Sequence, residues 1–391
     1  MAAESAQDFN QLEARAQRLV QEFVAAGAEY IAPSIIQPAG LFLDVVGESL
    51  RARTYVFGDP DGRELCLRPD LTVPACRVYL ERDPAALSAA KYCYNGPAFR
   101  YQPEGAPSVH AREFRQAGIE AFGLADRAAA DVEILTALIK ALRATGLEHF
   151  EVRIGDIGLF QSLLGSLEMP TRWRRRLAQQ FWRPEIFRAE LKRLVSQPAS
   201  TAAGIDAQLL EAIDPDQPTS AEHVIARYLE AKGYDLIGTR TISEIASGLV
   251  EASADFRAGP LKAETAELIQ SFLGVSGAPM EAVKRLEGLA GTAGLPQSSA
   301  FGLFRQRLDL LASHGHDVGR MSFAADFGRT FEYYTGFVFD IIAPRLGPRS
   351  PVAGGGRYDG LLRAVGAPYD VPAVGASIYT ERLMAALRGG A

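Results

Sequence analysis

Val352-Ala353-Gly354-Gly355-Gly356-Arg357-Tyr358-Asp359-Gly360-Leu361 is the stretch from which the fold of this chain can be inferred. Its three consecutive glycines allow positive φ angles or a close approach of the backbone to a ligand. The arginine, tyrosine and aspartate that follow place a cation, a phenol and a carboxylate beside that backbone. A second stretch, RTFEYYTGFVFD at residues 329–340, lies just upstream and ends in a strand pattern. Because a lone glycine-rich segment is usually a tight turn, the inference depends on the two stretches occurring together.

Length and composition indicate a globular protein with room for two domains. The chain has 391 residues, of which 48% are hydrophobic and 23% charged, and its formal net charge is -6. That charge argues against nonspecific nucleic-acid binding, although a local basic groove would be compatible with it. We expect no signal peptide in residues 1–10, no membrane span and a cytoplasmic location. Cys66, Cys76 and Cys93 have no metal-type spacing and are expected to be buried free thiols.

The pattern of apolar residues predicts an antiparallel sheet with a few helices in the first third of the chain. Apolar residues at helical spacing between Phe9 and Phe23 predict a helix that stops at Gly27. Further elements are predicted as strands at 30–36, 53–57, 63–67, 91–101 and 112–122, and as helices at 71–81 and 131–145.

The middle of the chain has a different character. Residues 169–291 are rich in Ala, Leu, Arg and Glu and lack alternation, which predicts several helices. Strand patterns return at 320–326, 332–342 and 371–378, and a last helix is predicted at 380–387. We therefore expect an α+β fold with a core at 1–165 and 300–391 and a helical insertion at 166–299.

Polar residues on one face of a predicted strand suggest a lined pocket. Alternation places Gln116 and Glu120 on the same face as Phe114, Gly118 and Phe122. A solvated edge strand would explain the same pattern, but the neighbouring strand that carries Arg100 favours a pocket. Upstream, Asp70 stands where a helix should begin and is a natural N-cap.

These segments resemble the motifs of histidyl-tRNA synthetases and their paralogues. The similar segments are Leu67-Arg68-Pro69-Asp70, Gly96-Pro97-x-Phe99-Arg100, Arg112-Glu113-Phe114-x-Gln116-x-Gly118-x-Glu120, the two stretches already quoted, and residues 373–383. The resemblance spans roughly residues 8–160 and 300–388. It implies a class II aminoacyl-tRNA synthetase-like core, a six-stranded antiparallel sheet flanked by helices.

The resemblance also implies a pocket for L-histidine. Asp70, Thr72 and Gln116 would face the α-amino group, and Arg329 would lie near the carboxylate. Glu120 and Tyr334 would face the imidazole, and Tyr358 would close the pocket. Arg100 and Tyr333 complete the expected histidine-binding set. No catalytic residue, metal or cofactor is expected.

Compared with a synthetase, the chain departs where ATP would bind. Gln102 replaces a carboxylate, Thr330 and Phe331 replace small and aliphatic residues, and Thr380 replaces a glycine. We expect no anticodon-binding domain after the third motif. This combination resembles the regulatory subunits of ATP phosphoribosyltransferase.

That second resemblance implies a non-catalytic chain of L-histidine biosynthesis, without aminoacylation and without tRNA. It would partner the short-form ATP phosphoribosyltransferase catalytic subunit and form a self-dimer within a hetero-oligomer. Two alternatives remain open: a truncated histidyl-tRNA synthetase that activates histidine, and a stand-alone histidine sensor with another partner.

Two further clusters have less specific interpretations. His314 and His316 lack further ligand residues nearby and are read as a polar helix end rather than a metal site. The basic run Arg172, Arg174, Arg175 and Arg176, beside Trp173 and Trp182, is read as a solvated helix face or a partner surface.

Overall fold

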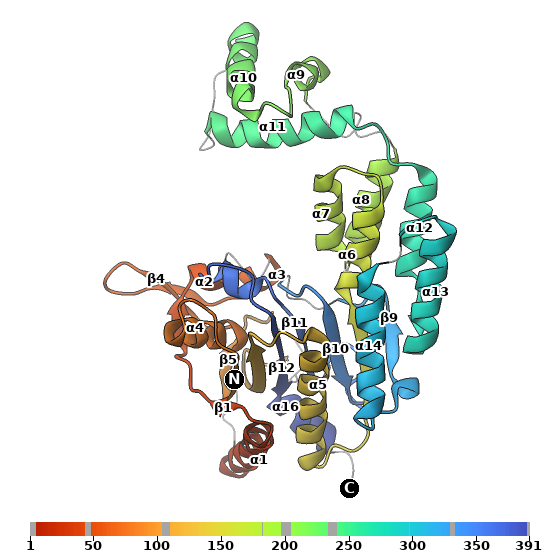
Figure 1. Ribbon diagram of the computed structural model, residues 1–391. Helices are drawn as coiled ribbons and strands as arrows, with labels where there is room; N and C mark the ends of the chain where they lie inside the picture. The colour runs from red at the N-terminus through yellow and green to blue at the C-terminus, as the bar shows by residue number, and fades with distance from the viewer. Residues whose placement is uncertain are drawn as a thin grey trace. The chain divides into compact units, whose positions relative to one another are not determined.

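The structure is a computed structural model that describes residues 5–43, 48–103, 110–181, 183–196, 205–233, 241–296, 298–328 and 333–388. The chain divides into two compact units, each described here by itself (Figure 1). The first unit is formed by Met1–Ser162 and Phe272–Ala391, and the second by Leu163–Ser271.

A mixed sheet organises the first unit. Its strand order is β1-β5-β6-β12-β11-β10-β7-β9-β8. The strands are β1 Glu29–Tyr30, β5 Ala90–Phe99, β6 Glu113–Phe122, β7 Glu151–Asp156, β8 Ser276–Gly277, β9 Ser322–Ala324, β10 Phe337–Ile342, β11 Ala353–Arg357 and β12 Ala373–Tyr379. The six strands from β5 to β7 in this order are all antiparallel neighbours, as the resemblance implied. The edges of the sheet differ from that expectation. At one edge β1 pairs in parallel with β5; toward the other, β9 pairs in parallel with β7, and β8 adds a further strand beside β9.

The glycine-rich stretch is a central strand and not a turn. Gly354, Gly355 and Gly356 lie in β11, between β10 and β12. A Cβ atom on Gly355 would lie 2.1 Å from the carbonyl oxygen of Gly375. The glycines therefore allow backbone to pack closely against backbone within the sheet, whereas the expectation from the sequence was a positive φ or a close approach to a ligand.

Helices pack against this sheet. They are α1 Ala6–Ala25, α5 Arg127–Ala144, α13 Pro279–Thr292, α14 Ser299–Ser313 and α16 Thr380–Leu387, with the 3-10 turn Val318–Arg320 after α14. The helix α1 begins at the cap residue Ser5 and buries Leu12, Ala16, Leu19 and Phe23, as its periodicity predicted. Figure 1 shows α5 and α14 running alongside each other, and α5 also contacts β11 and β12.

A second, three-stranded sheet lies beside α4. Its strands are β2 Ile36–Pro38, β3 Val56–Gly58 and β4 Glu64–Leu67, and the short helices nearby are α2 Gly40–Leu43, α3 Glu48–Arg51, α4 Thr72–Arg82 and α15 Leu361–Ala364. The strand predicted at 30–36 was wrong, because only its two ends pair, with different partners. Tyr79 of α4 stacks on Phe122 of β6 at 4.9 Å, which attaches this layer to the large sheet.

The second unit is helical in its described residues. It contains α7 Thr171–Gln180, α8 Pro184–Val195, α9 Ala207–Ala212, α10 Pro218–Lys232 and α11 Ile242–Arg257. The chain enters it through α6 Ile157–Ser166 and leaves through α12 Ala263–Leu273. This unit ends at Ser271, earlier than the 166–299 insertion expected from the sequence. The difference arises because α13 packs on β8, β9 and α14 and therefore belongs to the first unit.

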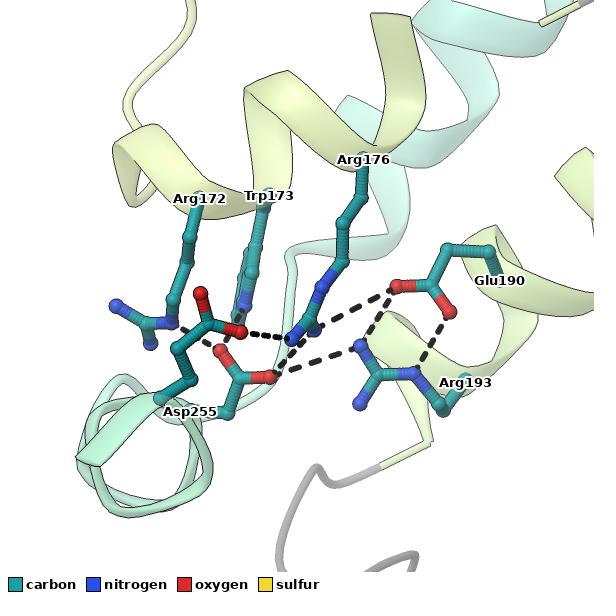
Figure 2. Close-up of polar contacts among 7 residues, drawn as sticks. Arg172, Trp173, Arg176, Glu190, Arg193 and Asp255 are labelled. Atoms are coloured by element: carbon teal, nitrogen blue, oxygen red, sulfur yellow. Dashed lines mark hydrogen bonds and ion pairs between the residues drawn. The ribbon is translucent and has the colours of Figure 1, made fainter. Parts of the chain in front are cut away.

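Two of the four arginines in the basic run of α7, Arg172 and Arg176, pair with a buried carboxylate, whereas Arg175 is exposed to solvent. Asp255 lies among the arginines Arg172 and Arg176 and the indole of Trp173, whose Nε1 donates to its Oδ1 at 2.6 Å (Figure 2). Arg193 of α8 joins the same carboxylate at 3.7 Å. The charges therefore serve to connect three helices of this unit. Trp182 lies outside the described residues.

Candidate functional site

A pocket of about 260 Å³ of empty volume, part of it open to solvent, lies over the middle of the large sheet. It is lined by Asp70, Thr72, Gln116, Tyr333, Tyr334, Gly354, Tyr358, Gly375, Ala376 and Ser377. The strands β6, β11 and β12 form its floor, and the start of α4 forms one wall. Six of the nine residues expected to bind histidine are therefore brought together in one place.

A buried carboxylate and a buried phenol beside the pocket need room that only glycine leaves. Glu120 is 1% exposed, and its side chain fills the position that a Cβ atom on Gly375 would take, 1.5 Å from Oε2. Likewise, a Cβ atom on Gly118 would lie 2.5 Å from the phenol of Tyr94. These two glycines give the sheet space to hold polar side chains next to the ligand pocket.

Glu120 is enclosed by three hydroxyl groups. Thr72 Oγ1 and Tyr94 Oη each donate to Oε1 at 2.8 Å, and Tyr358 Oη donates to Oε2. Burial raises the pKa of Glu120 to about 7, and the hydrogen bonds from Tyr358, Tyr94 and Thr72 oppose that rise. Glu120 is not among the lining residues, but it lies directly beside three of them, because Thr72 and Tyr358 donate to its carboxylate and its Oε2 occupies the space over Gly375.

Two buried acceptors face the pocket without a partner in the described part of the chain. Oδ2 of Asp70 and Oε1 of Gln116 accept no hydrogen bond there, although both residues are 2% exposed. Burial raises the pKa of Asp70, and the nearby Arg100 and the backbone N–H groups of Val73 and Thr72 oppose that rise. Buried acceptors are normally satisfied, so an unsatisfied pair marks a place for a donor from a ligand.

Asp70 accepts a hydrogen bond at the start of α4, but it is not the cap residue that the sequence predicted. The helix α4 begins at Thr72 with Leu71 as its cap residue, which makes no side-chain cap bond. Asp70 Oδ1 nevertheless accepts from Val73 N–H at 3.2 Å. One oxygen of Asp70 thus holds the start of the helix, and the other has no hydrogen-bond partner in the described part of the chain.

Three tyrosines form the aromatic wall. Tyr333 lies 4.8 Å from Tyr334 and 5.7 Å from Tyr358, measured between ring centroids, and Tyr334 and Tyr358 are 6.4 Å apart. Arg329, expected beside the ligand carboxylate, lies outside the described residues, as do Thr330 and Phe331.

Arg100 lies next to the pocket and is not one of its lining residues. Its Nε donates to the carbonyl oxygen of Pro69 at 2.8 Å, and its guanidinium lies 4.9 Å from the ring centroid of Phe114 and 5.9 Å from that of Tyr379. In this position Arg100 supports the turn that presents Asp70. Its contact with a ligand stays a prediction.

Two positions that differ from a synthetase, Gln102 and Thr380, make hydrogen bonds within the protein. Thr380 is 1% exposed and its Oγ1 donates to the carbonyl oxygen of Arg115 at 3.4 Å. Glu381 accepts from the N–H of Arg115 at 2.8 and 3.0 Å. The carbonyl oxygen of Gln102 accepts from Arg112 Nε at 3.0 Å.

Among the described residues, no group of three or more His, Cys, Asp or Glu side chains is placed to hold a metal ion. His314 is the cap residue of α14, and His316 Nε2 lies 2.9 Å from Thr136 Oγ1. No helix in the described ranges has the length and apolar character needed to cross a membrane.

Sequence reasoning missed Tyr94 and Gly375. Tyr94 stands opposite Gly118 in the register of β5 and β6, and Gly375 stands opposite Glu120 in that of β12 and β6. A glycine facing a large or charged residue across two strands is the signal that could have identified both. To recognise this signal one must know the pairing register of the two strands, which the sequence pattern alone does not supply.

The lining of the pocket favours one kind of ligand. Among the described lining residues the polar groups are hydroxyls, an amide and a buried carboxylate, which together favour a ligand rich in hydrogen-bond donors.

Comparison with known proteins identifies similar chains. The family model described as histidyl-tRNA synthetase matches residues 4–231 and 247–383. A protein from Chelativorans sp. named ATP phosphoribosyltransferase regulatory subunit is 35% identical, over 91% of this chain and 92% of the relative. A protein of the same name from Agrobacterium fabrum is 36% identical, over 94% and 95%.

Solved structures agree on the fold. An ATP phosphoribosyltransferase regulatory subunit/histidyl-tRNA synthetase from Bacillus halodurans C superposes with a TM-score of 0.70 at 20% identity, covering 100% of this chain and 82% of that one. A histidine–tRNA ligase subunit from Alicyclobacillus acidocaldarius gives a TM-score of 0.61 at 22% identity, covering 99% and 96%. At these identities the likeness shows the class II synthetase-like fold alone.

Proposed function

Because the chain belongs to the family of ATP phosphoribosyltransferase regulatory subunits, we propose that it assembles with the short-form catalytic subunit of that enzyme and regulates the first step of L-histidine biosynthesis. The observation that carries this proposal is the identity of 34–36% to regulatory subunits along nearly the whole length of both chains. The chain would act in the cytoplasm, as part of a hetero-oligomer in which it also forms a self-dimer.

We further propose L-histidine as the ligand of the pocket. Asp70 Oδ2 and Gln116 Oε1 are buried acceptors suited to an ammonium group, and the wall of Tyr333 and Tyr334 is suited to a flat ring. A charge-assisted hydrogen bond contributes about 1.5–3 kcal/mol. A few such bonds, reduced by the cost of immobilising the ligand, are enough for roughly micromolar binding.

Regulation requires more than binding. Histidine can change the catalytic rate only if the complex has two states that bind histidine with different affinity. We propose that the core at 1–165 and 300–391, which contains every described residue that lines the pocket, binds the histidine.

Mixing the purified chain with the short-form catalytic subunit is the direct experiment. The expected result is a larger complex on size-exclusion chromatography and higher transferase activity than that of the catalytic subunit alone. Histidine should lower this activity. Asp70→Asn should leave the complex intact while weakening the effect of histidine, which separates assembly from ligand binding.

Other outcomes would identify the alternatives. Histidine-dependent pyrophosphate exchange by the chain alone would show amino-acid activation, as in a synthetase. Histidine binding without any change in elution volume or in transferase rate would contradict the proposed partner and favour a stand-alone sensor.

A further inference from the structure

The turn that joins α4 to β5 carries a leucine that projects into solvent. Leu87 is 79% exposed, compared with 51% for Ile36, the next most exposed large apolar side chain among the described residues. Its neighbour Ala86 is buried and packs in the core of the first unit. Because single exposed leucines are common on protein surfaces, the surroundings of Leu87 must decide what this one means.

The backbone of this turn is strained and is held by hydrogen bonds. Ala86 has a φ of 54°, and no other non-glycine residue in the described ranges has a positive φ. Such a conformation is costly for a residue with a Cβ atom and persists only where surrounding contacts hold it. Here the N–H of Ser88 donates to Asp83 Oδ2 at 2.7 Å, and that of Ala86 donates to the carbonyl oxygen of Asp83 at 2.9 Å. Leu87 is therefore presented from a fixed backbone.

A second loop, just before β12, is joined to the turn. Tyr369 Oη lies 2.9 Å from the carbonyl oxygens of both Ala85 and Ala86 and donates its proton to them. The two loops therefore lie side by side, although Tyr369 and Ala85 are 284 residues apart in the chain. At the base of the turn Gly123 leaves room for this packing, because a Cβ atom there would lie 2.8 Å from the carbonyl oxygen of Ser88.

Together the two loops form an apolar surface, here called the Leu87 surface. Its exposed residues are Pro84, Ala85, Leu87, Ala89, Pro368 and Tyr369. The sequence has no charged residue between Asp83 and Lys91, and Asp370, which follows Tyr369, pairs with Arg363 at 3.8 Å. The carbonyl groups of the turn already have donors within the protein, from Tyr369 and from Tyr79 Oη, which donates to Ser88 at 2.7 Å. Lack of charge and an exposed aromatic residue are typical of the centre of a protein–protein interface.

The size and shape of the Leu87 surface favour a different chain over a second copy of this one. A stable interface usually involves about 20–30 residues on each side, so these two loops alone are too small to hold a homodimer together. A projecting leucine also needs an apolar recess on its partner. The pocket described on this chain does not suit it, because Asp70, Thr72 and Gln116 line that pocket with polar groups that a leucine would leave unsatisfied.

We propose that the Leu87 surface is a docking site for the short-form catalytic subunit, and that Leu87 enters an apolar recess on that subunit. The inference rests on the proposed function, which supplies the partner, and adds the place of contact. Because the turn is fixed before binding, docking costs little conformational entropy, and a small surface contributes more to affinity than a flexible loop of the same area would. Burial of an exposed leucine side chain corresponds to about tenfold or more in affinity.

Biolayer interferometry between the purified full chain and the purified catalytic subunit tests the inference. Leu87→Ser should lower the affinity by about tenfold or more and leave the melting temperature unchanged, because the side chain contacts little within its own chain. Ile186→Ser, at a position on α8 that is 47% exposed, is the matched control and should bind as the wild type does. Tyr369→Phe keeps the ring but removes the hydroxyl that holds the turn, so it should weaken binding less than Leu87→Ser does. Circular dichroism checks that each variant is folded.

Three other results would overturn the inference. Equal affinity of Leu87→Ser and the wild type would refute the docking site and leave the proposed function standing, whereas a wild-type chain that forms no complex would contradict both. An equal loss of affinity in Ile186→Ser would show that the effect is not specific to the Leu87 surface. Sedimentation velocity of the chain alone tests the other occupant, because weaker self-association of Leu87→Ser than of the wild type would assign the surface to a second copy of this chain.

Discussion

Nη1 of Arg307 lies 2.6 Å from Oδ2 of Asp156, and both side chains are shielded from solvent. Nε of the same guanidinium lies 2.6 Å from Asp131, and Asp131 in turn pairs with Arg357 at 2.6 Å. Arg357 directly precedes Tyr358, and its carbonyl oxygen accepts from the N–H of Thr335 at 2.8 Å. This buried chain of charges therefore extends from α14 and α5 to two segments of the pocket wall.

Replacing Arg307 by methionine should strongly destabilise the first unit. The change leaves Asp131 and Asp156 buried with reduced compensation, which costs about 3–5 kcal/mol. Urea denaturation followed by circular dichroism measures the loss. Lys284→Met, which breaks an exposed pair with Glu281, should change the free energy of unfolding by less than about 1 kcal/mol. Similar values for the two variants would contradict the structural role of the network.

Replacing Asp255 by asparagine should loosen the helical unit. Its carboxylate accepts from Trp173 and pairs with Arg172 and Arg176 (Figure 2), and loss of such charge-assisted bonds costs about 1.5–3 kcal/mol. Tryptophan emission, recorded in a Trp182→Phe background so that it reports Trp173, should shift to longer wavelength. Unchanged emission and stability would show that the cluster contributes little.

The same carboxylate predicts an acid sensitivity. Burial opposes ionisation of Asp255, but hydrogen bonds from Arg172, Trp173 and Arg176 outweigh it and lower the pKa. Its stabilisation is thus complete above the unfolded value of about 3.9 and is lost as pH falls through the lower folded value. The Trp173 signal should show this loss in the wild type. In Asp255→Asn the corresponding step should be missing.

Adding a methyl group at Gly375 should displace Glu120 and disturb the pocket. The new Cβ would occupy the place of Glu120 Oε2, so either the carboxylate or β12 must move. We expect histidine affinity to fall by at least about tenfold and stability by about 1–3 kcal/mol. Gly360→Ala is the matched control, because a Cβ atom there has no neighbour within 4 Å in the described structure. Normal binding by Gly375→Ala would refute the close packing.

Glu120 predicts an unusual pH dependence of stability. Its folded pKa of about 7 lies above the unfolded value of about 4.3, so the folded state binds more protons between these values. Its contribution to stability should therefore fall as pH rises from about 4.3 to about 7, by on the order of 4 kcal/mol at most. Asp70, Asp131 and Asp156 also titrate with raised pKa values. For that reason the quantity to measure is the unfolding free energy of the wild type minus that of Glu120→Gln. This difference should fall as pH rises across the range.

Much of the pocket could be predicted because its residues lie on elements with a clear local pattern. Alternation predicted β5 and β6, which the structure confirms within a few residues, and placed Gln116 and Glu120 on one face. The resemblance then identified Asp70, Thr72 and the tyrosines as their neighbours. Whether Glu120 itself contacts a ligand could not be predicted from the sequence, because this depends on how closely its side chain packs against Thr72 and Tyr358.

The helical unit was harder to anticipate. Its helices follow from composition, yet the basic run of α7 was read as solvent-facing, because arginines on an amphipathic helix usually are. Asp255, which pairs with Arg172 and Arg176 of this run, is 82 residues from Trp173. No local pattern links residues so far apart.

The sequence by itself determined the α+β class, the strands of the core, the family and most of the lining residues, because these follow from short periodicities and contiguous motifs. Only the tertiary structure decided which partner each buried charge has. Glu120 meets Tyr94 across 26 residues and Tyr358 across 238, and Arg307 meets Asp156 across 151. Such pairs form only when strand register and helix packing bring distant residues together, and a buried charge without its partner would be too costly to keep.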